Sequence, residues 1–226
     1  MKTIGMLGGM SWESSLVYYQ TINTAVRDRL GGLHSAACIL YSVDFAEIEA
    51  LQHAGKWDAA QQILVGAAQA LVRAGADLLI ICTNTMHKLA DGVASNISIP
   101  LLHIADPTAN AIHAAGLDTI ALLGTRFTME EAFYRRRLEA VHGLRVLIPD
   151  ADQRQMIHDI IYSELCLGHI RQASRRAYDQ VIDGLVARGA QGVILGCTEI
   201  GLLVDADGCR VPVFDTAHIH AQAAVD

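Results

Sequence analysis

Apolar residues along the chain fall into short continuous runs, which alternate with longer stretches where apolar and polar positions recur with helical spacing. Short apolar runs are typical of parallel strands buried on both faces, and the amphipathic stretches of the helices that cover such a sheet. The predicted strands are residues 2–7, 36–43, 77–82, 101–104, 119–123, 144–148, 192–196 and 212–214. The predicted helices are residues 12–30, 44–54, 57–75, 86–95, 107–116, 128–142, 151–167, 170–188 and 216–226. The pattern therefore predicts an α/β fold.

The pattern of elements occurs twice, in the same order. Three pairs of segments align: Thr3–Gly9 with Thr119–Thr125, Leu71–Ile81 with Leu185–Leu195, and Ile99–Leu102 with Val211–Phe214. A repeat of this length indicates duplication of a whole structural unit. We therefore expect two Rossmann-like parallel-sheet domains related by a pseudo-two-fold axis. Because open parallel sheets bind ligands at the carboxyl ends of their strands, we expect one active site in the cleft between the domains.

Composition excludes several classes of protein. Hydrophobic residues make up 52% of the 226 residues, and Lys+Arg 17 against Asp+Glu 24 gives a net charge of −7, which disfavours disorder and nucleic-acid binding. No apolar run reaches the roughly 20 residues that span a bilayer, so we expect no membrane association. Five cysteines without CxxC spacing indicate reduced thiols, and hence a cytoplasmic protein without disulfides or structural zinc.

The first strand of each half runs into a glycine turn that leads to a helix. The two segments are Gly8–Glu13 and Gly124–Glu131, with Ser11 and Thr128 as predicted N-caps and Thr128 and Glu131 at capping-box spacing. Backbone N–H groups at a helix N-terminus favour a carboxylate or phosphate, although a tight strand-to-helix connection could use the same residues. Neither segment matches a phosphate-binding loop or a dinucleotide fingerprint, so nucleotide binding is not supported.

The third strand of each half ends in polar residues. The segments are Ile81–Thr85 and Leu195–Glu199, and the repeat pairs Thr83 with Cys197. Under a pseudo-two-fold axis these side chains approach one point from opposite sides, which suits a reaction that removes a proton from one face of a carbon and returns one to the other. A cysteine beside a helix N-terminus can have its pKa lowered and act as a base or nucleophile. The alternative interpretation of Cys197 is a small buried residue without a chemical role.

Together these motifs resemble those of the aspartate/glutamate racemase family. The matching segments are Gly8–Trp12, Thr83–His87, Gly124–Thr125 with Thr128, and Gly196–Glu199, and they run along essentially the whole chain. The chain most resembles the aspartate racemase branch, which includes broad-specificity amino-acid racemases. The resemblance implies no cofactor, one catalytic residue from each domain and a homodimer. It also implies that the chain returns to the first domain near its end, giving residues 1–98 with 207–226 as one domain and residues 99–206 as the other.

One position departs from the family pattern. The family usually has Cys-Asn-Thr in the first half, whereas this chain has Thr83-Asn84-Thr85, so Cys197 is the only matched catalytic thiol. A hydroxyl is a far weaker acid than a thiol and cannot serve as an equivalent base without help. Cys82 is adjacent, but successive side chains of a strand point to opposite faces, so we do not expect it to substitute.

The resulting hypothesis is a cofactor-independent racemase of aspartate or glutamate, with Thr83 and Cys197 as catalytic residues and unequal proton exchange for the two enantiomers. The expected substrate-binding residues are Met10, Gln52, Asn84, Thr85, Thr125, Thr128, Thr198 and Glu199. Glu199 could orient Cys197 or cap the following helix. Apart from a second copy of the chain, a small-molecule amino acid is the only partner expected.

No metal site is expected. His218 and His220 lie two residues apart on the last predicted helix, where such positions do not share a face.

Two other function classes stay open. A cleft with one thiol could decarboxylate a malonate-type substrate or isomerise a diacid, because those reactions deliver a proton to one face only. A protein that lacks the second thiol could also bind an amino acid without turning it over.

Overall fold

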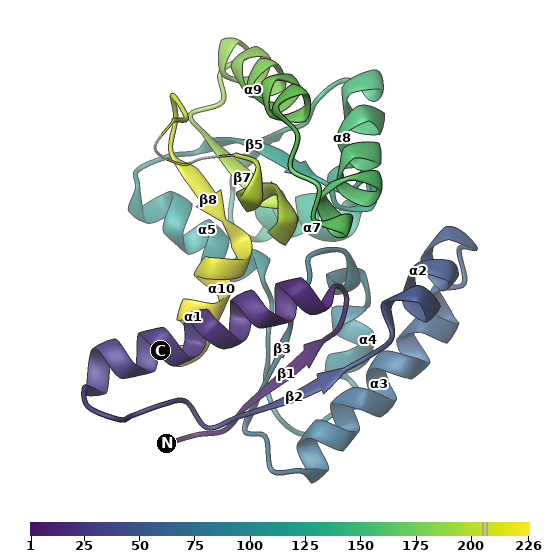
Figure 1. Cartoon of the computed structure of the whole chain (residues 1–226), viewed down its shortest axis with the longest axis vertical. Helices are drawn as coiled ribbons and strands as arrows, with labels where there is room; N and C mark the ends of the chain where they lie inside the picture. Colours follow the sequence, from purple (N-terminus) through teal and green to yellow (C-terminus); the bar gives the residue numbers. More distant parts are fainter. Residues whose placement is uncertain (205, 207) are drawn as a thin grey trace. The chain divides into compact units, whose positions relative to one another are not determined.

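The computed structural model describes residues 1–204, 206 and 208–226, and it divides into two compact units (Figure 1). One unit contains Met1–Ile104 and His220–Asp226, and the other contains Ala105–Ile219. Each has a parallel sheet of four strands with helices packed on it. The predicted α/β class with two Rossmann-like sheets is therefore confirmed.

The first unit has the strand order β2-β1-β3-β4. Its strands are β1 (Ile4–Gly8), β2 (Cys38–Ser42), β3 (Leu78–Ile81) and β4 (Leu101–Leu102). Its helices are α1 (Trp12–Leu30), α2 (Phe45–His53), α3 (Trp57–Arg73), the 3-10 turn η1 (Thr85–Leu89) and α4 (Ala90–Ala94). Alternate strand residues such as Leu7, Leu79 and Ile81 pack against α3, because successive side chains point to opposite faces of the sheet.

The second unit has the equivalent order β6-β5-β7-β8. Its strands are β5 (Thr119–Gly124), β6 (Arg145–Leu147), β7 (Gly192–Gly196) and β8 (Val213–Asp215). Its helical segments are α5 (Ala105–Ala114), α6 (Arg126–Glu130), α7 (Ala132–Arg136), η2 (Arg137–Val141), α8 (Ala151–Ser163), η3 (Leu165–Leu167), α9 (Gln172–Ala187) and η4 (Thr198–Leu202). The core under α8 and α9 contains Leu123, Val193 and Leu195. The last helix, α10 (Thr216–Val225), contains the boundary between the units.

The two sheets bear out the repeat found in the sequence. In the first, β1 pairs with β3 with Leu7 opposite Ile81, and in the second, β5 pairs with β7 with Leu123 opposite Leu195. All of these pairings are parallel, so the carboxyl ends of both central strands lie at the same edge of each sheet. Residues that follow β1 and β3, or β5 and β7, are therefore neighbours.

The boundaries between the units differ from those expected. Residues 207–226 were assigned to the first domain, but β8 pairs with β7 through Val193↔Val213 and Ile194↔Phe214, so this strand belongs to the second unit. Only His220–Asp226 return to the first. The physical reason is that so short a strand depends for its backbone hydrogen bonds on the sheet beside it. For the same reason β4 joins β3, which moves the other boundary from residue 98 to Ile104.

Helix starts confirm one predicted cap and correct the other. Ser11 is the N-cap of α1 and its side chain accepts from the Ser14 N–H. The cap in the second unit is Thr125, whose side chain accepts from the Thr128 N–H at 3.3 Å, so Thr128 lies inside α6 and forms no capping box with Glu131. The helix starts earlier than predicted because Thr125, and not Thr128, has the extended backbone and the side-chain hydrogen bond of an N-cap. Among the described residues, no helix is both long and apolar enough to cross a bilayer.

Candidate active site

The turn after β3 carries three of the predicted residues. Thr83 is half-buried, whereas Asn84 and Thr85 are buried at the start of η1. The ladder with β1 extends one residue past β3, because the Cys82 N–H donates to the Leu7 carbonyl at 2.9 Å. Thr83 is therefore the first residue of this segment whose side chain can face away from the core at the carboxyl edge of the sheet.

Cys82, beside Thr83, is part of the core. Its side chain has no exposed surface, and burial raises the pKa of its thiol far above the ordinary value of 9.0. A thiol in this environment stays protonated and is inert. The structure gives Cys82 no role in place of Thr83.

The turn after β1 lies beside the turn after β3. Gly9 has a φ of 89°, and a Cβ there would collide with the backbone of Val43, so only glycine fits. The Gly9 N–H donates to the Ser15 Oγ at 2.8 Å, which ties the turn to α1. Met10 is buried in the core with its side chain among apolar residues. Its backbone, and not its side chain, is therefore the part that could contact a ligand.

Gln52 belongs to the same end of the first unit. It lies on α2 and is buried, and its Nε2 donates to the Sδ of Met86 at 2.9 Å. Met86 follows Thr85 in η1, so this contact places Gln52 next to the turn after β3. The sequence predicted Gln52 as a substrate-binding residue, but it did not predict the contact with Met86.

Cys197 immediately follows β7 and is buried. Its Sγ donates to the Oε2 of Glu199 at 3.0 Å. Burial raises the pKa of the Cys197 thiol well above 9.0, and the negative charge of Glu199 raises it further. A lowered thiol pKa at this strand end is therefore not found, because burial and the charge of Glu199 outweigh the lowering effect of the hydrogen bond to the Glu199 backbone.

Two further residues of the second unit lie near Cys197. Burial raises the pKa of Tyr178 well above 10.0, and the charge of the nearby Cys197 raises it further. The charge of Cys166 in turn contributes to the raised pKa of Cys197. Tyr178 comes from α9 and occupies an apolar position of that helix, so the sequence pattern gave no signal that it lies by the thiol. Thr198 is half-buried at the start of η4.

The turn after β5 lies beside Cys197 because Gly124 pairs with Gly196. Thr125 is buried, and its Oγ1 lies 3.2 Å from that of Thr128. Thr128 is fully buried, and its side chain lies directly against the two glycines: a Cβ on either would meet it at 3.2 Å. Thr128 thus packs under the turn on its buried side, and this position does not favour the direct substrate contact that was expected of it.

Each unit therefore gathers its own set of polar groups at the carboxyl edge of its sheet. In the first unit these are the backbone after Gly9, Gln52 and Thr83–Thr85. In the second they are Thr125 and Cys197–Glu199. Among the described residues, no group of three or more His, Cys, Asp or Glu side chains is placed to hold a metal ion.

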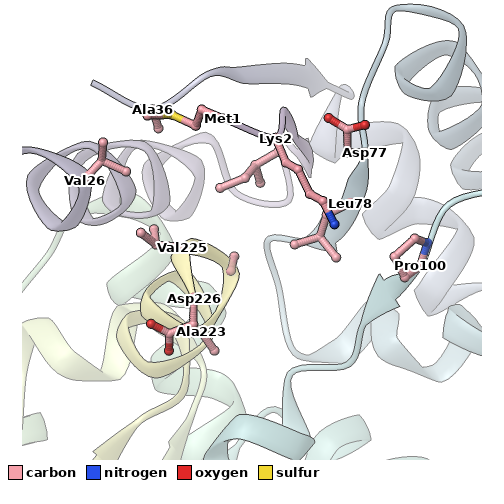
Figure 2. A pocket seen from close by; sticks show the side chains of 12 residues that line it. Met1, Lys2, Val26, Ala36, Asp77, Leu78, Pro100, Ala223, Val225 and Asp226 are labelled. Carbon is pink, nitrogen blue, oxygen red and sulfur yellow. The ribbon is translucent and has the colours of Figure 1, made fainter. Parts of the chain in front are cut away.

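One pocket of the first unit lies away from these residues (Figure 2). It has a volume of about 350 Å³ and is lined by residues that precede or begin the strands, including Ile4, Leu78 and Pro100. Both chain ends also contribute to its wall. Because it lies at the amino ends of the strands, it is not the candidate active site.

Comparisons with known proteins point to one family. The family model described as Asp/Glu/Hydantoin racemase matches residues 7–224. The broad specificity amino-acid racemase RacX of Bacillus subtilis is 24% identical over 168 residues, covering 74% of this chain and 72% of the relative.

Solved structures give the same result. A crystal structure from Yersinia pestis, provisionally assigned as an Asp/Glu racemase, has a TM-score of 0.94 and 57% identity over 100% of this chain and 98% of its own. An aspartate racemase homologue from Pyrococcus horikoshii has a TM-score of 0.86 and 34% identity over 100% and 98%. The likeness in both cases covers both units.

Proposed function

Because the chain belongs to the Asp/Glu/hydantoin racemase family, whose racemases are cofactor-independent isomerases, we propose that it interconverts the enantiomers of an acidic amino acid, aspartate or glutamate. The observation that carries the proposal is the duplicated strand end, which provides Cys197 in one unit and Thr83 at the equivalent position of the other. Racemisation requires proton transfer on both faces of the α-carbon, and the duplication supplies a group for each face.

Cys197 is the proposed base on one face. Its thiol proton passes to the Glu199 carboxylate along their hydrogen bond, and the resulting thiolate takes the α-proton of the substrate. A thiol of raised pKa is a weak acid, but its thiolate is a correspondingly strong base, which suits removal of a weakly acidic Cα–H. Glu199 thereby has a proton-accepting role in addition to orienting the thiol.

Thr83 is the proposed group on the other face. Its hydroxyl, or a water bonded to it, donates a proton to the carbanion. The Thr83 alkoxide or the hydroxide left behind then takes up the proton held on Glu199 through solvent. Protons then balance: one leaves Cα to Cys197, one arrives from the Thr83 side, and the protonation states of both sites are restored by exchange with water. The donors proposed to spread the carbanion charge onto the substrate carboxylate are Asn84, Thr85, Thr198 and the backbone N–H groups near Met10 and Thr125.

Unequal groups on the two faces lead to a specific kinetic signature. The two enantiomers have equal free energies, so kcat/KM for inversion must be the same in both directions. The enantiomer whose α-proton faces Cys197 can nevertheless lose it and regain a solvent proton without inverting. We therefore expect exchange with retention to be fast for one enantiomer and slow for the other.

The test is incubation with L- and D-aspartate and with L- and D-glutamate in D₂O, followed by chiral separation and mass measurement. We expect Cys197→Ser to abolish exchange and Thr83→Cys to bring the exchange rates of the two enantiomers together. Equal exchange rates in the unaltered protein would contradict the assignment of Thr83. Binding without turnover would favour an amino-acid-binding protein, and turnover of malonate-type diacids alone would favour a decarboxylase.

A further inference from the structure

A cluster of three buried histidines lies behind the turn that carries Thr83. His87, His103 and His220 are 2%, 7% and 0% exposed. The ring centres of His87 and His103 are 4.6 Å apart, and those of His87 and His220 are 5.7 Å apart. The chemistry proposed above uses none of the three.

The hydrogen bonds of His87 fix its protonation state. Its Nδ1 lies 2.7 Å from the Thr83 carbonyl oxygen, which can only accept, so Nδ1 carries a hydrogen. Its Nε2 accepts from the Ile104 N–H at 3.2 Å, so Nε2 carries none. The ring is therefore neutral, in the Nδ1–H tautomer, and connects two backbone segments.

His220 holds the neighbouring segment in a similar way. Its Nε2 lies 3.0 Å from the Leu102 carbonyl oxygen and therefore donates to it. Its Nδ1 lies 2.9 Å from the hydroxyl of Tyr18, a fully buried residue of α1. The two rings thus hold Leu102 and Ile104, the residues on either side of His103.

The histidine cluster provides hydrogen bonds beyond the point where the pairing of β3 with β4 ends. The pairing of β3 with β4 stops at Ile80↔Leu102, so Thr83 has no partner strand on that side. The His87 ring joins the Thr83 carbonyl to Ile104 and continues the connection beyond the ladder. On the side of β4, the backbone that carries the Thr83 side chain is therefore held by an imidazole in place of a β-sheet hydrogen bond.

We propose that His87 is a positioning residue, which orients Thr83 for proton delivery to its face of the α-carbon, supported by His220 and Tyr18. This inference rests on the proposed racemase function. A displacement of about 1 Å at a reacting group can lower a rate by about 10²-fold, so loss of the bond to the Thr83 carbonyl should act mainly on the step that uses Thr83. The step at Cys197 belongs to the other unit and should be unaffected.

The kinetic test compares His87→Leu, which removes both bonds, with His87→Asn, whose amide can still donate to the Thr83 carbonyl. With L- and D-aspartate and L- and D-glutamate in D₂O, we expect His87→Leu to lower kcat for inversion by about 10²-fold. Exchange with retention at the Cys197 face should change little, and His87→Asn should restore part of the inversion rate. The matched control is His34→Leu, at an exposed loop position of the same unit.

Three kinetic outcomes would overturn the inference: unchanged inversion in His87→Leu, an equal loss of inversion and retention exchange, or no recovery in His87→Asn. A wild-type protein that turns over none of the four substrates would instead overturn the proposed function. The hydrogen-bond arrangement is tested independently of turnover and of any variant's folding by ¹⁵N NMR of the histidine rings in the unaltered protein. We expect His87 as the neutral Nδ1–H tautomer, and the Nε2–H tautomer or a cationic ring at neutral pH would overturn the inference as well.

Discussion

At Cys197 two effects act on the thiol in the same direction. Burial disfavours the thiolate, and Glu199 adds both a negative charge and an acceptor for the S–H proton, so both raise the pKa. Replacing the carboxylate by a neutral amide removes one of them. We expect Glu199→Gln to lower the pKa of Cys197 and to move the appearance of thiolate to lower pH. Thiolate absorbance near 240 nm, measured against pH as a difference from Cys197→Ser, checks this.

The same substitution has a second consequence for the rate. A glutamine cannot take the thiol proton, so the maximum rate should fall although the thiolate forms at lower pH. Cys82→Ser is the control, because Cys82 lies outside the candidate site and is buried in the first unit. A thiolate that appears at higher pH in Glu199→Gln would show that the carboxylate stabilises the ionised thiol, which would contradict the prediction.

Which residues lie at equivalent strand ends was more predictable than how they are bonded. Thr83 and Cys197 were expected at equivalent strand ends, and the register of the two sheets places them there. The bonds from Cys197 to Glu199 and from His87 to Thr83 depend on the conformation of each turn, which apolar periodicity does not encode. Tyr178 comes close to Cys197 through the packing of a distant helix, and its sequence position resembles any buried aromatic residue.

At the scale of elements, two glycines allow β5 and β7 to approach closely just before the site. A Cβ on Gly196 would lie 2.8 Å from the Leu123 carbonyl oxygen and 3.2 Å from Thr128 Cγ2. Because backbone cannot move aside cheaply, we expect Gly196→Ala to destabilise the protein by about 1–3 kcal/mol and to displace Cys197. Denaturant unfolding, together with the rate of α-proton exchange, measures both effects.

A matched control for this change exists in α9. A Cβ on Gly184 would meet no atom within 4 Å, so Gly184→Ala should raise the free energy of unfolding by about 0.5–1 kcal/mol through helix propensity. If both glycine variants change stability equally, close strand approach is not the cause.

The predicted elements agree best with the structure where burial alone decides them. Every apolar run became a strand, and α1 begins and ends at the predicted residues. The predicted helix over residues 128–142 is instead divided, because Glu131 has extended backbone with a ψ of 152° between α6 and α7. Helical periodicity continues across such a break, so the pattern could not reveal it. The domain boundary was taken from the family resemblance, whereas the repeat, which aligns the β4 and β8 segments, agrees with the pairing of each strand in its own sheet.

At the scale of the whole molecule, the homodimer implied by the family resemblance remains a prediction, and α1 offers a surface for it. Trp12, Leu16 and Tyr19 are 64%, 55% and 50% exposed, and their spacing places them on one face of the helix. Large apolar side chains that gather on one exposed face are typical of protein–protein contacts. We expect a second copy of this chain to cover them.

A charge in the middle of this face should weaken the dimer without disturbing the core. We expect Leu16→Glu to shift the protein from dimer towards monomer in sedimentation equilibrium, because an interface of this kind would bury the carboxylate away from water. Glu13→Gln is the control, since Glu13 lies in the first turn of the same helix but is not one of the three apolar positions. A dimer of unchanged affinity in Leu16→Glu would place the contact elsewhere. A monomeric unaltered protein would contradict the dimer itself, while leaving Cys197 and Thr83 to be tested by proton exchange.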